Sequence, residues 1–159
     1  MREQRLRTVR SHASVRFDGV HELPKLADSA QLAGIVKPVL KALPDDSYKR
    51  GRAAMLAGYV ADMHRVFEGI AAVVVDSAPV AVVVGNSLHG RNGDWLIASD
   101  LLLAAVAEAS HFECERILVA RRPPRRGGNE PLLRESVIML RKRPALADVI
   151  DKRVSAATT

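Results

Sequence analysis

Three residues that follow a run of apolar residues are the first candidates for a ligand-binding cleft. Residues 80–84 read Val-Ala-Val-Val-Val, and Gly85, Asn86 and Ser87 come directly after them. In α/β proteins, ligands bind beyond the carboxyl ends of the strands. We therefore expect Asn86 or Ser87 to line a ligand-binding cleft. The alternative is an ordinary turn between a strand and a loop.

Arginine-rich loops are the candidates for contact with a polyanion. The residues concerned are Arg91, Arg121, Arg122, Arg125 and Arg126. Arginine forms charge-assisted hydrogen bonds to phosphate, which position a nucleic acid without reading its sequence. The sequence predicts nucleic-acid contacts at these side chains, and solvated loops are the alternative.

The other reactive residue types form no catalytic or metal-binding pattern. None of the five histidines has metal-ligand spacing to acidic residues or to Cys114. No Ser/His/Asp set and no pair of catalytic carboxylates is enforced by spacing. We predict no catalytic residue and no metal ligand, and we interpret Cys114 as a small buried apolar residue.

Basic residues are concentrated in two parts of the chain. The net charge is +6, with +4 in residues 1–16 and +7 in residues 116–143, which leaves −5 for the remainder. Clustered arginine is typical of proteins that bind DNA or another polyanion. A solubilising surface explains the same charge equally well.

Length and composition favour a single soluble domain. The chain has 159 residues, of which 48% are hydrophobic and only 4% aromatic. One cysteine excludes an intrachain disulfide framework, and we find no signal peptide and no membrane-spanning segment. We expect a cytoplasmic protein without a membrane partner.

The helices that position these residues are predicted from apolar spacing. Residues 29–43 predict a helix that Pro38 should kink or shorten. A longer helix is predicted from Tyr48 to Ala71, with Val66 and Phe67 both in its apolar stripe and Arg52 on its polar face. A third helix should be capped by Ser99 or Asp100 and run to Ala109.

Three strands are predicted, at residues 80–84, 114–121 and 135–142. The first is wholly apolar and is expected to be buried on both faces of a sheet. Residues 88–95 are expected to form a loop. The connection between the last two strands is too short for a crossover helix, so these strands should be antiparallel.

The order of these elements is similar to the end of a class I S-adenosylmethionine-dependent methyltransferase. Four segments, at residues 59–63 (YVADM), 82–87 (VVVGNS), 111–113 (HFE) and 134–142 (RESVIMLRK), resemble the C-terminal half of bacterial DNA amino-methyltransferases. These enzymes methylate adenine N6 or cytosine N4. Residues 10–17 resemble the segment that follows the catalytic loop of that family.

The resemblance implies a partial Rossmann-like α/β sheet with helices on both faces and a C-terminal antiparallel hairpin. It implies S-adenosylmethionine as cofactor and DNA as substrate. The expected organisation is an irregular basic segment over 1–28, an incomplete methyltransferase-like domain over 29–143 and a tail over 144–159.

Two motifs of that family are absent from the sequence. The only Pro-Pro pair, Pro123-Pro124, lies between arginines with no aromatic residue after it, and no Phe-x-Gly-x-Gly cofactor turn is present. We expect a truncated or split methyltransferase that is inactive alone. Its apolar strand should have an open edge that binds a second chain or a second copy. The alternatives are a basic nucleic-acid-binding module and a non-catalytic partner subunit.

Overall fold

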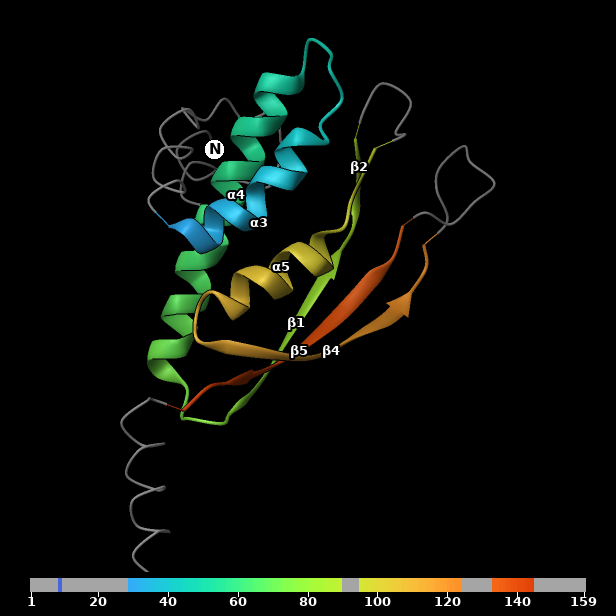
Figure 1. Ribbon diagram of the computed structural model, residues 1–159. Helices are drawn as coiled ribbons and strands as arrows, with labels where there is room; N and C mark the ends of the chain where they lie inside the picture. The colour runs from blue at the N-terminus through green and yellow to red at the C-terminus, as the bar shows by residue number, and fades with distance from the viewer. Residues whose placement is uncertain (1–8, 10–28, 90–94, 124–132, 145–159) are drawn as a thin grey trace, which may run out of the picture.

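The computed structural model describes residue 9 and residues 29–89, 95–123 and 133–144, which form a mixed α/β arrangement of helices packed on a sheet (Figure 1). Its helices are α3 (Ala30–Lys41), α4 (Lys49–Val73) and α5 (Ser99–Glu108). Its strands are β1 (Pro79–Gly85), β2 (Ser87–His89), β3 (Trp95–Ile97), β4 (Phe112–Arg121) and β5 (Glu135–Lys142). This confirms the general α/β class.

The main sheet has the strand order β1-β5-β4, and both pairings are antiparallel. The predicted hairpin of the last two strands is therefore confirmed, with β5 at its predicted bounds and β4 starting two residues early at Phe112. Because β5 is antiparallel to both neighbours, β1 and β4 run in the same direction. Helix α5 lies between β1 and β4 in the chain and packs on the sheet.

The prediction of helices on both faces is wrong for the described residues. All three described helices lie on one side of the main sheet in Figure 1, and the opposite side of β1 is open: Val83 is 71% exposed. The prediction that residues 80–84 are buried on both faces is wrong for the same reason. Residues of β1 are alternately exposed and partly buried, as at a half-covered edge strand.

A second hairpin was missed in the region predicted as a loop. Strands β2 and β3 pair antiparallel, with Leu88 opposite Leu96 and His89 opposite Trp95. The two aromatic rings of His89 and Trp95 meet edge to face with centroids 5.9 Å apart. Three-residue strands are too short for alternation to be visible in the sequence. The described residues therefore contain five strands where three were predicted.

Helix α3 begins directly after its N-cap, Ser29, and continues beyond its proline. The Ser29 hydroxyl accepts a hydrogen bond from the Leu32 amide at 3.3 Å, as an N-cap serine does. The helix continues for three residues after Pro38, to Lys41, so the predicted shortening is small. Helix α5 differs: its N-cap is Ala98 and not Ser99 or Asp100, although the Asp100 carboxylate accepts a hydrogen bond from the Leu101 amide in the first turn.

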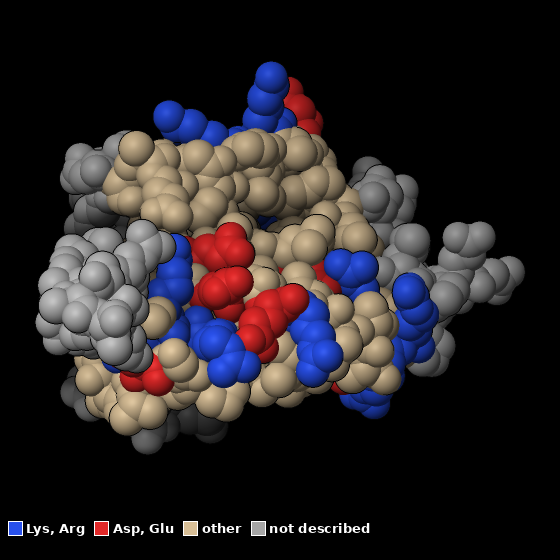
Figure 2. All heavy atoms as spheres, turned by 60° about the horizontal axis from the view of Figure 1, so that its bottom comes forward, with Lys and Arg blue, Asp and Glu red and all other residues tan. Residues whose placement is uncertain are grey.

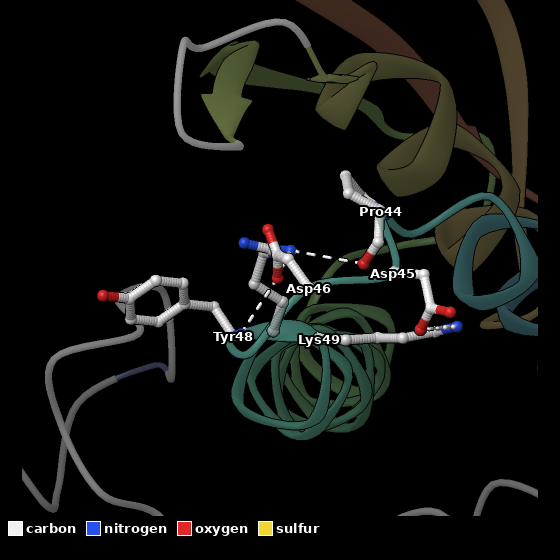
Figure 3. Close-up of polar contacts among 6 residues, drawn as sticks. Pro44, Asp45, Asp46, Tyr48 and Lys49 are labelled. Atoms are coloured by element: carbon white, nitrogen blue, oxygen red, sulfur yellow. Dashed lines mark hydrogen bonds and ion pairs between the residues drawn. The ribbon is translucent and has the colours of Figure 1, made fainter.

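The connection between α3 and α4 buries a charge that the helical pattern placed on the polar face. Arg52 is only 5% exposed, and its Nη2 donates to the carboxylate of Asp46 and to the Pro44 carbonyl. In Figure 3, Asp46 lies beside Tyr48, and the Tyr48 amide donates to Asp46 Oδ1 at 2.9 Å. Lys49 and Asp45 form an exposed ion pair on the same turn.

The core lies between the helices and the covered face of the sheet. Phe67 of α4 and Phe112 of β4 are both fully buried, and their rings meet edge to face with centroids 6.1 Å apart. Val66, which the pattern assigned to the same stripe, is 39% exposed.

Among the described residues, no helix combines the length and apolar character needed to cross a bilayer.

Candidate functional site

A buried carboxylate joins three elements at the carboxyl end of β1. Asp100, in the first turn of α5, is fully buried, and Arg134 donates to it through Nε at 2.7 Å and Nη2 at 3.1 Å. The Ser136 hydroxyl donates to Oδ2 at 2.7 Å. Asn86, just after β1, accepts from the Asp100 backbone amide through Oδ1 at 3.4 Å and donates its backbone N–H to the Arg134 carbonyl at 2.9 Å. We call these four residues the Asp100 cluster.

The Asp100 carboxylate is held in its ionised form. Burial alone would raise its pKa, because a charged group loses hydration in the interior. Hydrogen bonds from Arg134, Ser136 and the Leu101 amide oppose burial, and the pKa of Asp100 lies below its ordinary value. The positive end of the α5 dipole acts in the same direction.

The chemistry of the Asp100 cluster is that of a structural ion pair. A general base needs a pKa near the working pH and an unengaged lone pair, whereas Asp100 has a lowered pKa and accepts from several donors. Arg134 is neutralised by the same contact, so the cluster presents no net positive charge to a phosphate. Its effect is to fix the start of α5 against β1 and β5.

The predicted cleft residues separate in the structure. Asn86 belongs to the Asp100 cluster, and its side-chain oxygen is used within the protein. Ser87 begins β2 and its hydroxyl lies 3.0 Å from His89 Nε2. Gly85 ends β1 opposite Glu135. The three residues are consecutive at one end of β1, but the polar side chains of Asn86 and Ser87 bind different partners within the protein.

Replacement of Gly85 by alanine should leave the fold intact. A Cβ at this position would lie 3.6 Å from the Glu135 side chain, which is ordinary van der Waals contact. Removing glycine's freedom in the unfolded chain should raise the free energy of unfolding by about 0.4–1 kcal/mol. Urea unfolding of Gly85→Ala measures this. A fall in the free energy of unfolding would contradict this prediction and would show that β1 needs glycine here for a reason other than space.

Of the five arginines predicted to contact DNA, two lie among the described residues. Arg121 ends β4 and forms a two-point ion pair with Glu135, at 2.6 and 2.8 Å. Arg122 follows it and is exposed. Arg91, Arg125 and Arg126 lie outside the described residues. The Glu135 contact raises the pKa of Arg121 and, more importantly, balances its charge.

Charges of both signs are mixed on the described surface. Figure 2 shows acidic and basic side chains interspersed over the end of the molecule that lies at the bottom of Figure 1. There Arg141 pairs with Glu115, and Lys142 lies 3.1 Å from Asp76. This face is therefore unlike the continuous basic surface that binds a nucleic-acid backbone.

The same end holds an open hollow that sequence reasoning missed. Its volume is about 1000 Å³, and its wall carries Glu68, Glu108, His111, Lys142 and Arg143. His111 Nε2 lies 3.8 Å from Glu68, and Arg143 donates to the Glu108 carbonyl. Glu68, Glu108 and Lys142 come from three different elements, and His111 and Arg143 lie just outside elements, so no local motif marks them. Acidic and basic side chains are mixed in its wall, so the hollow has no concentrated charge of either sign.

Cys114 occupies β4, where it is partly buried against the core, which agrees with its interpretation as an apolar residue. Burial and the nearby Glu108 charge raise the pKa of its thiol. No group of three or more potential ligands among the described His, Cys, Asp and Glu residues could hold a metal ion.

Comparisons with protein-family models, curated proteins and solved structures found no match for this chain.

Proposed function

We propose that the chain is a non-catalytic part of an S-adenosylmethionine-dependent DNA amino-methyltransferase. In this proposal, the chain contributes the C-terminal part of a Rossmann-like sheet. The catalytic loop and the glycine-rich cofactor turn come from residues that this sequence does not contain. The substrate class is DNA methylated at adenine N6 or cytosine N4.

The observation that carries the proposal is the position of β5. The last strand of the described sheet lies antiparallel between β1 and β4, which are joined through α5. A terminal antiparallel hairpin beside a strand-helix-strand unit is what the sequence resemblance implies. The four resembling segments fall on α4, on β1 and its following turn, at the start of β4, and on β5.

The described residues do not fit S-adenosylmethionine by themselves. The polar groups at the carboxyl end of β1 are engaged with one another, because Asn86 bonds to Asp100 and Asp100 pairs with Arg134. No side chain there is left buried with an unmet hydrogen bond that would indicate a missing ligand; among the described residues that condition occurs only at Arg52 Nε, on α4. In this proposal, no side chain of this chain takes part in methyl transfer.

The alternative of a basic nucleic-acid-binding module has weaker support. Arg121 is paired with Glu135, and the described basic residues of β5 contact carboxylates or carbonyl oxygens. Arg116 of β4 and Arg122, just after β4, are exposed as well. A module of that kind would bind duplex DNA with a steep dependence on salt and no response to S-adenosylmethionine.

We expect the purified chain alone to show no saturable heat of binding when titrated with S-adenosylmethionine. The pair formed with a polypeptide that carries a Pro-Pro-aromatic loop and a glycine-rich turn, sought first in an adjacent reading frame, should bind the cofactor. That pair should also transfer a labelled methyl group to duplex DNA. Saturable binding and methyl transfer by the chain alone would overturn the non-catalytic role. Salt-sensitive DNA binding with no cofactor response in any pair would support the module instead.

A further inference from the structure

The two edges of the main sheet differ in how they are protected. Strand β4 carries charged residues, among them Glu113, Glu115 and Arg116, and its register with β5 shifts twice. Charges, bulges and prolines are devices by which proteins prevent strand pairing at an exposed edge. Strand β1 has no charge and no bulge, and its proline, Pro79, is confined to the first residue of the strand. Its sequence is Pro-Val-Ala-Val-Val-Val-Gly, and its register with β5 is regular from Pro79 to Gly85.

The free edge of β1 presents unpaired backbone groups. At one end of the strand the Asn86 amide donates to the Arg134 carbonyl, and at the other the Lys142 amide donates to the Ala78 carbonyl. The even-numbered residues of β1 therefore direct their backbone N–H and C=O groups toward β5. In an antiparallel pair, the residues between them direct these groups away from the partner strand. Ala81 and Val83 thus direct their backbone groups to the free edge, where no described strand pairs with them.

Among the described residues, nothing that lies around this edge blocks the addition of another strand. Helix α5 packs on β4 and β5 more than on β1. The β2–β3 hairpin extends beyond the carboxyl end of β1 rather than along its side (Figure 1). The Val83 side chain is 71% exposed, and Ala81 is exposed as well.

We propose that a second copy of this chain pairs with β1 along this edge, antiparallel and two-fold symmetric, so that two three-stranded sheets become one six-stranded sheet. The pairing centres on Val82, so that Ala81 of each copy exchanges backbone hydrogen bonds with Val83 of the other. A two-fold axis perpendicular to the sheet keeps the helices of both copies on one face. Residues of the same face then meet, with Val80 opposite Val84.

The absence of charge on β1 favours a second copy as the occupant. Every facing pair in the self-pairing is apolar, so no like charges are brought together, which would otherwise oppose an isologous contact. The inference does not depend on the proposed function. If a partner polypeptide adds a strand at the same edge, partner binding and self-pairing are alternative uses of β1.

Sedimentation equilibrium of the full chain tests the proposal, with a dimer expected at micromolar to millimolar concentrations. Val83→Pro removes an amide proton that points away from β5, so it should leave the intramolecular ladder intact. It should raise the dimer dissociation constant about tenfold or more. Val83→Lys should have the same effect by placing a charge at the edge. Leu118→Lys, on the open side of β4, is the matched control and should leave the dimer unchanged.

Hydrogen exchange supplies a readout that does not need a variant. The Ala81 and Val83 amides should be protected in concentrated wild-type protein and should exchange faster on dilution, while the Val82 amide stays protected. A wild-type monomer at all concentrations would overturn the proposal. So would a dimer that Leu118→Lys disrupts as strongly as Val83→Lys, because that result would indicate pairing through the open sheet face.

Discussion

Replacement of Asp100 by asparagine should lower the free energy of unfolding by about 3 kcal/mol. The carboxylate is fully buried and receives Arg134 and Ser136, so an amide would face a guanidinium with one acceptor too few. Removing one partner of a buried ion pair costs about 3–5 kcal/mol. The lower end applies here, because the Arg134 side chain is 29% exposed and can recover some hydration. Urea unfolding at neutral pH measures the loss.

The same substitution should change how stability depends on pH. Because the pKa of Asp100 is lower in the folded protein than in the unfolded chain, the unfolded chain takes up its proton first on acidification. The contribution of Asp100 is therefore complete above its unfolded pKa and is lost as pH falls through its folded pKa. Between about pH 5 and pH 2, the wild type should lose more stability than Asp100→Asn.

Glu135→Gln is the matched control for Asp100→Asn. Glu135 is on the same strand as Ser136 and has its own two-point arginine contact, but the Arg121 side chain of that pair is 69% exposed. Exposed ion pairs contribute little. The control should move the urea midpoint much less than Asp100→Asn. Equal effects of the two variants would show that burial of the Asp100 cluster has no energetic consequence.

Local pattern was sufficient to predict the main strands and helices. The bounds of β5 and the antiparallel β4–β5 hairpin follow from apolar runs and a connection too short for a helix. The position of β1 does not follow, because a wholly apolar run suits a central strand and an unprotected edge equally well. Pairing with β5, about 50 residues later in the chain, determines which of the two it becomes.

Side-chain partners that are distant in sequence explain what could not be predicted at the site. Asp100 and Arg134 are 34 residues apart, so spacing suggested a helix cap for Asp100 and no role for Arg134. Arg52 is buried because Asp46 and Pro44, in the loop before α4, bind its guanidinium. A helical pattern assigns arginine to the polar face and carries no information about an adjacent loop.

Phe67→Ala should lower the free energy of unfolding by about 4 kcal/mol, which is the second large effect that we expect. Phe67 is fully buried on α4, and its ring meets that of Phe112 on β4, so truncation removes a contact between the helical layer and the sheet. The cost combines lost transfer free energy with the cavity left behind. Thermal and urea unfolding should both report it.

Val66→Ala is the control that separates packing from helical pattern. Val66 precedes Phe67 in the same helix and belongs to the same predicted apolar stripe, yet it is 39% exposed. Alanine has the higher helix propensity, which offsets the small area of valine lost from contact, so the expected change is within about 0.5 kcal/mol. If Val66→Ala were as damaging as Phe67→Ala, the side of α4 that faces the sheet would be assigned wrongly. The positions of α5 and the Asp100 cluster, which depend on that packing, would then need to be revised.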